Sequence, residues 1–516
     1  MPTNTSPSKF YLDGKKLNKI EQQKAEKDGL AIGTELNHFA KIGWEKMEKS
    51  DLELRLKWYG MFWRPKTPGK FMLRLRIPNG ILNSQQTRVI ATIVERYGDN
   101  GSCDITTRQN LQLRGVLIND LPNIIKQLKD VGLQTLQSGF DNPRNVTGNP
   151  LAGIDPQEII DTRPFTIELQ DFLTNKGEGN HEFSNLPRKW NTAVAGSKDN
   201  FLLHNDIVFH PVSNNGVLGF GVWIGGILSP QMNSYAIPLN AWIPQEDICR
   251  MTDCVIRVWR DNGERNIRSK GRFRAYLEAV GFDTVRQQIE EIYGPLTPDP
   301  GSVFDEKPRS HYGIHQQKQD DLYYVGLHVP VGRLTAEDLH DLATAANSYG
   351  EGEGEIRLTE DQNLILANIH QAQLDELKND SLLKRFPTNP GTVASGTVSC
   401  TGSAYCSFAM VNTKDRAKTI ADELDQELNL PDEVKIHWTG CPNTCGQAYM
   451  GAIGLTGKKA KNSEGVIGEG FQITVGGSQG PDPTVGDIYM KTVPAEDVKS
   501  VVKDLLIEKF GATCKS

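Results

Sequence analysis

The sequence predicts an α+β protein that is duplicated internally, with two ferredoxin-like half-domains and two larger α+β domains related by pseudo-twofold symmetry. The first observation is a strand–turn–helix–strand unit at residues 73–113 that recurs at residues 327–366. The second is that both copies contain the string Gln-Asn-Leu, at 109–111 and 362–364. Strands and helices that alternate in this order build ferredoxin-like sandwiches, and their recurrence indicates a repeated structural unit.

Each copy begins with a strand and a turn, LRLRIPNG at 73–80 and LHVPVG at 327–332. A helix-like stretch follows, and each unit ends with a strand, DITTRQNLQL at 104–113 and RLTEDQNLIL at 357–366. These units divide the 516 residues into an N-terminal arm at 1–60, a first half-domain at 61–135, a domain with basic loops at 136–305, a second half-domain at 306–388 and a domain with cysteine loops at 389–516.

Two loops rich in glycine and polar residues follow each copy of the unit. After the first copy come DNPRNVTGNP and LPRKWN, which carry Arg144 and Lys189. After the second copy come SCTGSAYC and HWTGCPNTCG, which carry four cysteines. Because the halves repeat, we expect the four loops to meet at one centre, with cations from one half and thiolates from the other.

The four cysteines form two close pairs that suit a metal centre. Cys400 and Cys406 are separated by five residues, and Cys441 and Cys445 by three. Soft thiolate ligands suit an iron–sulfur cluster, and the surrounding glycines supply N–H groups to sulfur. Zinc sites favour gaps of two to four residues, so the wider gap counts against zinc. The spacing favours a cluster and leaves zinc or reduced structural cysteines as alternatives.

The string TGCPNTCG, preceded by CTGSAYC, resembles the cluster-binding signature of the sirohaem-containing sulfite and nitrite reductases. The resemblance extends over residues 58–507, with four motifs in the family's order. It implies a [4Fe–4S] cluster held by Cys400, Cys406, Cys441 and Cys445, and a sirohaem whose iron takes Cys445 as its axial ligand. Electrons would reach the haem iron through that shared sulfur.

Sirohaem carries many carboxylates and the substrate is an anion, so a protein that buries both needs cations nearby. By the resemblance, Arg74, Arg144 and Lys189 form the substrate cage. The resemblance places six further residues around the sirohaem, namely Thr106, Arg108, Gln112, Arg114, Arg272 and Asn443. Arg76 shares a strand face with Arg74, but the resemblance gives it no role.

One sequence position distinguishes the nitrite reductases of this family from the sulfite reductases. Sulfite reductases resemble LPRKWN but have a second lysine where this chain has Asn191. A single lysine beside a neutral amide suits nitrite, which has one negative charge, better than the sulfite dianion. We therefore predict a six-electron reduction of nitrite to ammonium. The alternatives are a ferredoxin-dependent sulfite reductase and an iron–sulfur electron carrier without catalytic activity.

Charge and composition restrict the partners. The net charge of −7 argues against nucleic-acid binding, and no apolar stretch reaches the roughly 20 residues that span a membrane. The start of the chain lacks the pattern of a targeting signal, so we expect a cytoplasmic protein. We also expect a monomer. No role is predicted for the other cysteines, Cys103, Cys249, Cys254 and Cys514.

The electron donor is expected to be a separate protein. The chain has no G-x-G-x-x-G motif at the start of a strand–helix unit, so direct use of a nicotinamide is not expected. The resemblance indicates reduced ferredoxin, with flavodoxin as a substitute. Two groups of cations are candidate docking surfaces for this acidic partner, namely Lys57, Arg64, Lys66 and Lys70, and Lys458, Lys459 and Lys461.

Overall fold

A computed structural model describes residues 17–98, 101–305 and 307–515. The first sixteen residues of the arm, on which the expected absence of a targeting signal depends, lie outside this part of the chain. The described residues form four five-stranded sheets and two short two-stranded ribbons. None of their helices is both long and apolar enough to cross a membrane.

Two of the sheets form the ferredoxin-like half-domains, and all of their strand pairs are antiparallel. The first contains, in spatial order, β1 (Met61–Phe62), β2 (Phe71–Arg74), β5 (Leu111–Val116), β4 (Ser102–Ile105) and β15 (Arg333–Thr335). The second contains β13 (Gly313–Gln316), β14 (Leu322–Leu327), β17 (Leu364–His370), β16 (Gly350–Leu358) and β3 (Ile81–Asn83).

The two half-domains exchange one strand each. β15 belongs to the second repeat but pairs with β4, and β3 belongs to the first repeat but pairs with β16. Each exchanged strand follows the Pro-Gly turn of its repeat, η4 (Pro78–Gly80) or η9 (Pro330–Gly332). Every half-domain sheet is therefore completed by the other half of the chain.

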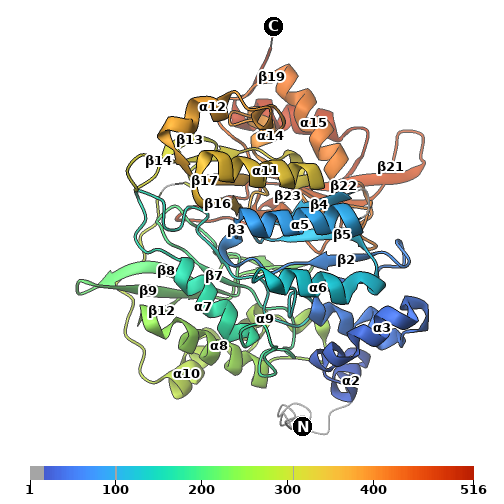
Figure 1. The fold of residues 1–516 in the computed structure, drawn as a ribbon, viewed down its shortest axis with the longest axis vertical. Helices are drawn as coiled ribbons and strands as arrows, with labels where there is room; N and C mark the ends of the chain where they lie inside the picture. The colour runs from blue at the N-terminus through green and yellow to red at the C-terminus, as the bar shows by residue number, and fades with distance from the viewer. Residues whose placement is uncertain (1–16, 99–100, 306, 516) are drawn as a thin grey trace.

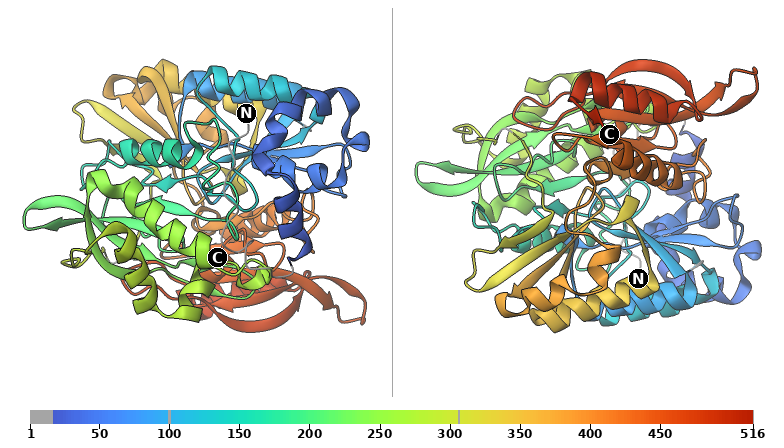
Figure 2. Two further views of the ribbon diagram at one scale, coloured as in Figure 1. Left: turned by 90° about the horizontal axis from the view of Figure 1, so that it is seen from below. Right: turned by 90° about the horizontal axis from the view of Figure 1, so that it is seen from above.

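Helices α5 (Ser84–Tyr97) and α11 (Ala336–Tyr349) follow the exchanged strands and pack side by side (Figure 1). Each begins with a capping box, formed by Asn83 and Gln86 in α5 and by Thr335 and Asp338 in α11. Figure 2 shows these helices along one side of the molecule, opposite the C-terminal sheet. Three further helices complete this region, α6 (Leu121–Asp130), α12 (Leu374–Lys378) and α13 (Leu382–Arg385).

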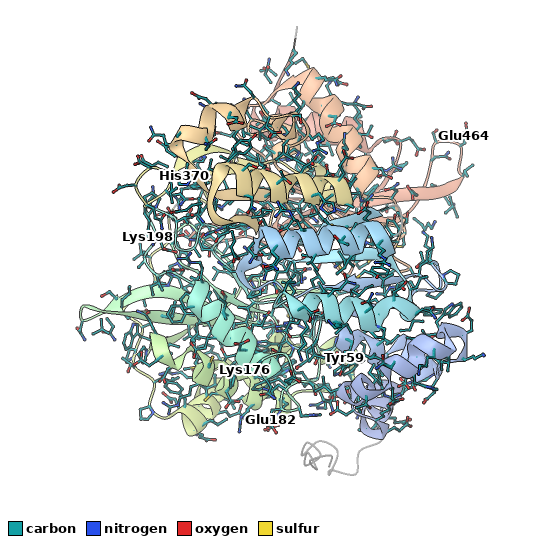
Figure 3. All side chains as sticks on the ribbon, in the orientation of Figure 1. Tyr59, Lys176, Glu182, Lys198, His370 and Glu464 are labelled. Atoms are coloured by element: carbon teal, nitrogen blue, oxygen red, sulfur yellow. The ribbon has the colours of Figure 1, made fainter. Side chains whose placement is uncertain are left out.

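The two larger domains share one sheet topology, in which two parallel pairings are followed by two antiparallel ones. The first sheet contains β6 (Thr147–Gly148), β7 (Thr192–Val194), β8 (Ile207–Asn214), β9 (Val217–Ile224) and β12 (Ile237–Pro244). The second contains β18 (Thr397–Ser399), β20 (Ile436–Thr439), β21 (Ile453–Lys461), β22 (Ile467–Val475) and β23 (Asp487–Pro494). The hairpin of β21 and β22 projects from the molecule, with Glu464 at its tip (Figure 3).

Each of these domains also contains several helices. The first domain contains α7 (Arg163–Thr174), α8 (Ile248–Asn262), α9 (Phe273–Val280) and α10 (Phe282–Tyr293), and the second contains α14 (Thr392–Ser395), α15 (Lys414–Glu427) and α16 (Val498–Phe510). The short ribbons pair β10 (Ile227–Leu228) with β11 (Asn233–Ser234) and β19 (Leu428–Asn429) with β24 (Thr513–Cys514). Each domain has its own apolar core, in which Trp190 and Trp259, or Trp438 and Phe471, are in contact.

The repeated Gln-Asn-Leu string joins each half-domain to a larger domain. Gln109 and Gln362 both have positive φ, in the turns that follow β4 and β16. The Gln109 amide exchanges hydrogen bonds of 2.9 and 3.0 Å with the backbone of Gly148 at β6. Gln362 accepts from the Ser399 N–H at β18 and donates to the Ile105 carbonyl. The same residue therefore performs the same task in both repeats.

The arm packs against the basic loops through a buried ionic cluster. It contains α2 (Lys19–Glu26), η1 (Gly29–Glu35), α3 (Leu36–Ile42), η2 (Trp44–Lys46), α4 (Lys49–Glu53) and η3 (Arg55–Tyr59). The Lys24 amine donates to Glu21, to Asp141 at 3.1 Å and to the Leu186 carbonyl. Asp141 also accepts from Arg268. One helix of the arm thus connects both loops that carry the predicted cations.

Candidate functional site

A cavity lies where the two halves of the chain meet. The first half contributes cations, namely Arg74 from the end of β2, Arg108 from the turn between β4 and β5, and Arg144 and Lys189 from the basic loops. The second half contributes Cys400, Thr401, Lys414 and Cys445. The structure therefore brings together the two sets of loops that the sequence predicted to converge.

The cations that the first half contributes to this cavity have no carboxylate partner within the described ranges: none of the ion pairs there includes Arg74, Arg108, Arg144 or Lys189. Burial lowers the pKa of Arg144 well below its ordinary value, and repulsion from Arg74 and Arg108 adds to the shift. Burial also lowers the pKa of Lys189, with Arg108 as the next cause. Four positive groups that repel one another in a buried cavity form a site for anions.

Backbone carbonyls hold Arg144 in place. Its guanidinium donates to the carbonyls of Ser138 at 2.6 Å and Phe140 at 2.9 Å, while Nε has no partner among the described residues. Arg76 lies behind it, fully buried, and donates to the carbonyls of Pro143 and Arg144. Arg76 thus points inward but braces the loop and does not line the cavity.

Asn191 lies behind the cavity wall. Its side-chain oxygen accepts from Arg108 Nε at 3.1 Å, and its amide donates to Asp206 at 2.9 Å. Arg272 donates to both oxygens of Asp206 at 3.0 Å. Asn191 and Arg272 are therefore buried members of a network that orients Arg108.

The remaining predicted sirohaem residues differ in their placement. Thr106 and Gln112 line the cavity with Arg108. Arg114 lies next to the cavity, where it pairs with Asp104 at 2.7 Å and donates to the Thr401 hydroxyl in the first cysteine loop. Asn443 is exposed, and its backbone N–H points to the thiol of Cys441.

The four predicted ligand cysteines lie near one another. The thiol of Cys441 interacts electrostatically with those of Cys400, Cys406 and Cys445, and each of them raises its pKa. Cys400 accepts a hydrogen bond from the Gly440 N–H at 3.1 Å. Burial raises the pKa of the Cys441 thiol to about 12, and the N–H of Asn443 opposes that shift. Cys445 is exposed and lines the cavity together with the cations of the first half.

Comparison with known proteins identifies the domains. A family model described as "Nitrite and sulphite reductase 4Fe-4S domain" matches residues 139–295 and 392–507. A second, described as "Nitrite/Sulfite reductase ferredoxin-like half domain", matches residues 64–131 and 315–382. The chain belongs to the nitrite and sulfite reductase family. The resemblance and the duplicated α+β fold predicted from the sequence are confirmed.

Similar members of the family come from bacteria and plants. The chain is 51% identical to the "Ferredoxin--nitrite reductase" of Synechococcus elongatus, over 97% of this chain and 98% of that protein. It is 42% identical to the "Ferredoxin--nitrite reductase, chloroplastic" of Zea mays, over 96% of this chain and 90% of that protein. The solved structure of the Mycobacterium tuberculosis NirA protein superposes with a TM-score of 0.88 and 27% identity, over 96% and 93% of the two chains.

The cysteine loops fit the cluster that the family description names. No group of three or more His, Cys, Asp or Glu side chains in the described part of the chain is arranged to hold a single metal ion. A tetrahedral zinc site would bring its sulfurs within about 4 Å of one another. A four-iron cluster gives each thiolate its own iron, so its cysteines stand further apart. The N–H donor to Cys400 suits a thiolate ligand.

Two buried residues at the site, Lys414 and Asp206, were not predicted from the sequence. Lys414 lines the cavity, donates to the Val331 carbonyl and lies 3.8 Å from Asp104. Burial lowers its pKa to about 8, although Asp104 opposes the shift. Asp206 is the common acceptor for Asn191 and Arg272. Lys414 follows the first cysteine loop closely, which was the one available signal, whereas nothing local to Asp206 indicated its partners.

Proposed function

We propose that this protein reduces nitrite to ammonium, taking six electrons from reduced ferredoxin through a [4Fe–4S] cluster to a sirohaem. One observation carries the proposal: a buried cavity in which unpaired cations from one half of the chain face cysteines from the other. Relatives named ferredoxin–nitrite reductase match nearly the full length of the chain. Sulfite reduction is the second candidate, because the family models include both activities.

The chain's own residues divide into cofactor and substrate groups. We propose that Cys400, Cys406, Cys441 and Cys445 hold the cluster, with Cys445 also facing the sirohaem iron. The proposed sirohaem contacts are Thr106, Arg108, Gln112, Arg114, Arg272 and Asn443. Sirohaem, once bound, supplies the iron at which the anion is reduced. Arg272 and Asn443 do not line the cavity, so Arg272 would act through Asp206 and Arg108.

Arg74, Arg144 and Lys189 are proposed to bind the anion. The two guanidinium groups offer N–H donors in a planar array that matches the oxygens of nitrite. The Lys189 amine takes part in no hydrogen bond between described residues, so its N–H groups are available to the substrate. Burial and repulsion from Arg108 lower the pKa of this amine, so it gives up a proton more readily than an ordinary lysine.

Two observations support one of the two candidate surfaces for the donor. Lys66 donates to the Ser403 carbonyl in the first cysteine loop. Arg64 lies between the rings of Phe62 and Phe408, at 5.6 and 5.4 Å, and Phe408 is 61% exposed. Lys57 is half-buried over Phe140, and burial lowers its pKa to about 8. We propose that an acidic ferredoxin docks over Arg64, Lys66 and Lys70, next to the cysteines.

The test is anaerobic reconstitution, followed by visible spectra and by assays of both anions with reduced ferredoxin. The expected result is a sirohaem spectrum and higher kcat/KM for nitrite than for sulfite. A colourless protein that holds only zinc would overturn the proposal. For the donor surface, Lys66→Glu should raise the KM for ferredoxin at low salt more than Lys459→Glu on β21. Equal effects would count against docking beside the cysteines.

Cytoplasmic location and a monomeric state remain predictions. Both can be checked on the native protein, by cell fractionation and by light scattering during size-exclusion chromatography.

A further inference from the structure

Nitrite reduction requires protons as well as electrons. Conversion of one nitrite and six electrons to ammonium and two waters consumes eight protons, and all of them must reach a buried cavity. The cations that line this cavity cannot supply them without being reloaded from solvent. The structure contains a line of titratable side chains, outside the residues assigned above, between this cavity and a second pocket.

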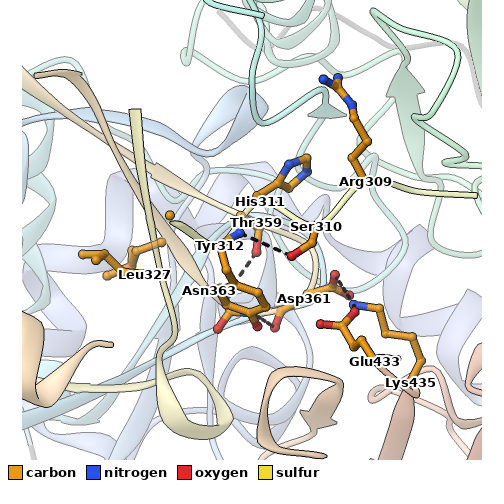
Figure 4. Close-up of a pocket in the computed structure, with 12 residues that line it drawn as sticks. Arg309, Ser310, His311, Tyr312, Leu327, Thr359, Asp361, Asn363, Glu433 and Lys435 are labelled. Atoms are coloured by element: carbon orange, nitrogen blue, oxygen red, sulfur yellow. Dashed lines mark hydrogen bonds and ion pairs between the residues drawn. The ribbon is translucent and has the colours of Figure 1, made fainter. Parts of the chain in front are cut away.

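The second pocket is lined in part by the turn between β16 and β17, which contributes Thr359, Asp361 and Asn363 (Figure 4). Lys435 lies at its mouth and pairs with Asp361 at 2.8 Å and with Glu433 at 2.7 Å. These three side chains are partly exposed to solvent. This pocket therefore brings water to the turn that carries Asp361 and its neighbour Glu360.

The turn is the repeat of the one that carries Arg108. Thr106-Thr107-Arg108-Gln109-Asn110 in the first half corresponds to Thr359-Glu360-Asp361-Gln362-Asn363 in the second. Both turns close with the same backbone hydrogen bond, from Thr106 to Asn110 at 2.9 Å and from Thr359 to Asn363 at 3.0 Å. One repeat thus presents a cation to the cavity, while the other presents two acids between the cavity and the outer pocket.

Two buried histidines lie beside these acids. His437 on β20 bonds through Nδ1 to the Gln447 carbonyl at 3.1 Å, and its Nε2 has no partner within the described residues. The Gln447 amide lies 3.2 Å from His204 Nε2. His204 Nε2 is also 3.8 Å from Glu360 Oε1, which has no hydrogen-bond partner among the described residues. The His204 side chain is only 2% exposed.

We propose that Glu360 and His204 form a proton relay from the outer pocket to the Arg108 and Lys189 side of the cavity. This inference rests on the proposed function, because it assigns the supply of protons for the same reaction. The geometry favours it, since the Glu360 carboxyl and the His204 imidazole are 3.8 Å apart, which a small side-chain rotation can close. The turn that carries Glu360 separates the two spaces, because Asp361 lines the outer pocket and Gln362 lines the cavity.

The relay moves one proton at a time. Rotation of the Glu360 side chain brings its O–H into hydrogen-bond distance of His204 Nε2. The O–H bond then breaks as an N–H bond forms at Nε2, and the proton on Nδ1 passes to water in the cavity, where the reduction consumes it. The Glu360 carboxylate then takes a proton from water of the outer pocket, and the imidazole returns to its first tautomer. No electron moves in these steps, so each cycle transfers one proton and restores both side chains.

The charges around both groups support these roles. Burial raises the pKa of Glu360 to about 8, Asp361 adds to the shift and Arg108 opposes it. Glu360 is therefore protonated at neutral pH. Burial lowers the pKa of His204 to about 3, with Arg108, His437 and Lys189 as further causes. His204 is thus neutral at rest and holds an extra proton only briefly.

The main test is Glu360→Gln in the cofactor-loaded enzyme. The substitution keeps the shape and removes the acid, so kcat for nitrite should fall about tenfold at saturating donor. The KM for nitrite and the visible spectrum should not change. The wild-type rate should decline above about pH 8, where Glu360 loses its proton, and this decline should be absent in the variant. Glu360→Asp should restore part of the rate.

Two further measurements separate a relay from a structural role. Infrared difference spectra of the wild type should contain a carboxyl band that titrates near pH 8 and is absent in Glu360→Gln. His204→Gln should lower kcat in the same way and leave that band present. Glu353→Gln is the matched control, because Glu353 lies on β16, the strand before the Glu360 turn, and accepts a hydrogen bond from the Asn83 amide away from both pockets.

Unchanged kcat and an unchanged pH profile in Glu360→Gln would overturn the relay, as would an infrared spectrum without the titrating band. If the wild type reduces nitrite in such a case, the proposed function stands and only the relay fails. If the wild type reduces sulfite and not nitrite, the proposed substrate fails. The same variants then test the relay with sulfite, whose reduction also consumes protons.

Discussion

Arg144 is held in place by groups that do not neutralise it. Its guanidinium donates to the carbonyls of Ser138 and Phe140 and forms no ion pair with a carboxylate in the described structure. Arg74 and Arg108 repel its charge. An incoming anion relieves this repulsion, so the contribution of Arg144 to binding should be large.

Arg144→Gln should weaken nitrite binding roughly tenfold to a hundredfold, because one charged hydrogen-bond partner of the anion is lost. A nitrite titration of the visible spectrum measures this effect. Arg257→Gln on α8 is the control, since Arg257 is exposed and pairs only with Asp253 on its own helix. Equal affinity in the two variants would remove Arg144 from the substrate cage.

Asn191→Lys should raise the turnover of sulfite relative to nitrite. The new ammonium group would lie between Arg108 and Asp206, where it adds positive charge behind the cavity wall. Steady-state assays with both anions give the ratio. Asn191→Ala is the control, because it breaks the link to Asp206 without adding charge. If the alanine variant changes the ratio as much as the lysine variant, the position of Arg108 and not charge sets the preference.

Site residues that belong to a recognisable sequence motif could be predicted from the sequence. The cysteines and Arg74, Arg144 and Lys189 were predicted in this way, and in the structure Arg74, Arg144, Lys189, Cys400 and Cys445 line one cavity, while their roles stay predictions. Asp206, Lys414 and Glu360 could not be assigned from the sequence. Their neighbours are distant along the chain, and an isolated Asp, Lys or Glu has the same pattern as a solvated surface residue.

At the scale of helices and strands, α2 supports the basic loops. Its Lys24 amine is enclosed by Glu21, Asp141 and the Leu186 carbonyl. Asp141 begins the loop that carries Arg144, and Leu186 begins the loop that carries Lys189. A break in this cluster should therefore affect both stability and the position of the cations.

Lys24→Met should lower the free energy of unfolding by about 3 kcal/mol, because it removes one buried cation from Glu21 and Asp141 and leaves them Arg265 and Arg268 as partners. Urea unfolding followed by circular dichroism measures the loss. Lys126→Met on α6 is the control, since its ion pair with Asp130 is exposed and contributes at most about 1 kcal/mol. If Lys24→Met lowers the free energy of unfolding by no more than Lys126→Met does, the buried cluster does not depend on Lys24 for its stability.

The repeated units were predictable at this scale because hydrophobic pattern and turn residues are local. The exchange of β3 and β15 was not predictable. Both are three-residue strands that follow a turn, and either could have paired within its own half. Their partners, β16 and β4, are distant in sequence and are fixed only by the packed structure.

At the scale of the whole molecule, the exchanged strands make each half dependent on the other. Separate expression of residues 1–305 and 307–516 should give two chains that do not fold alone, because each lacks one strand of a half-domain sheet. Co-expression should restore a complex with the visible spectrum of the intact enzyme. Size-exclusion chromatography and thermal unfolding test this outcome. A monomeric fragment with a cooperative transition would contradict it.

The exchange also has a consequence during protein synthesis. The outer edge of β4 is closed by residues 333–335, which the ribosome adds long after Ile105. At about 5–20 residues per second, this interval lasts on the order of 10–50 seconds. For that time the nascent first sheet has an open edge that could pair with other chains. Chaperone binding to ribosome-attached chains should therefore be strongest between the emergence of β4 and that of β15.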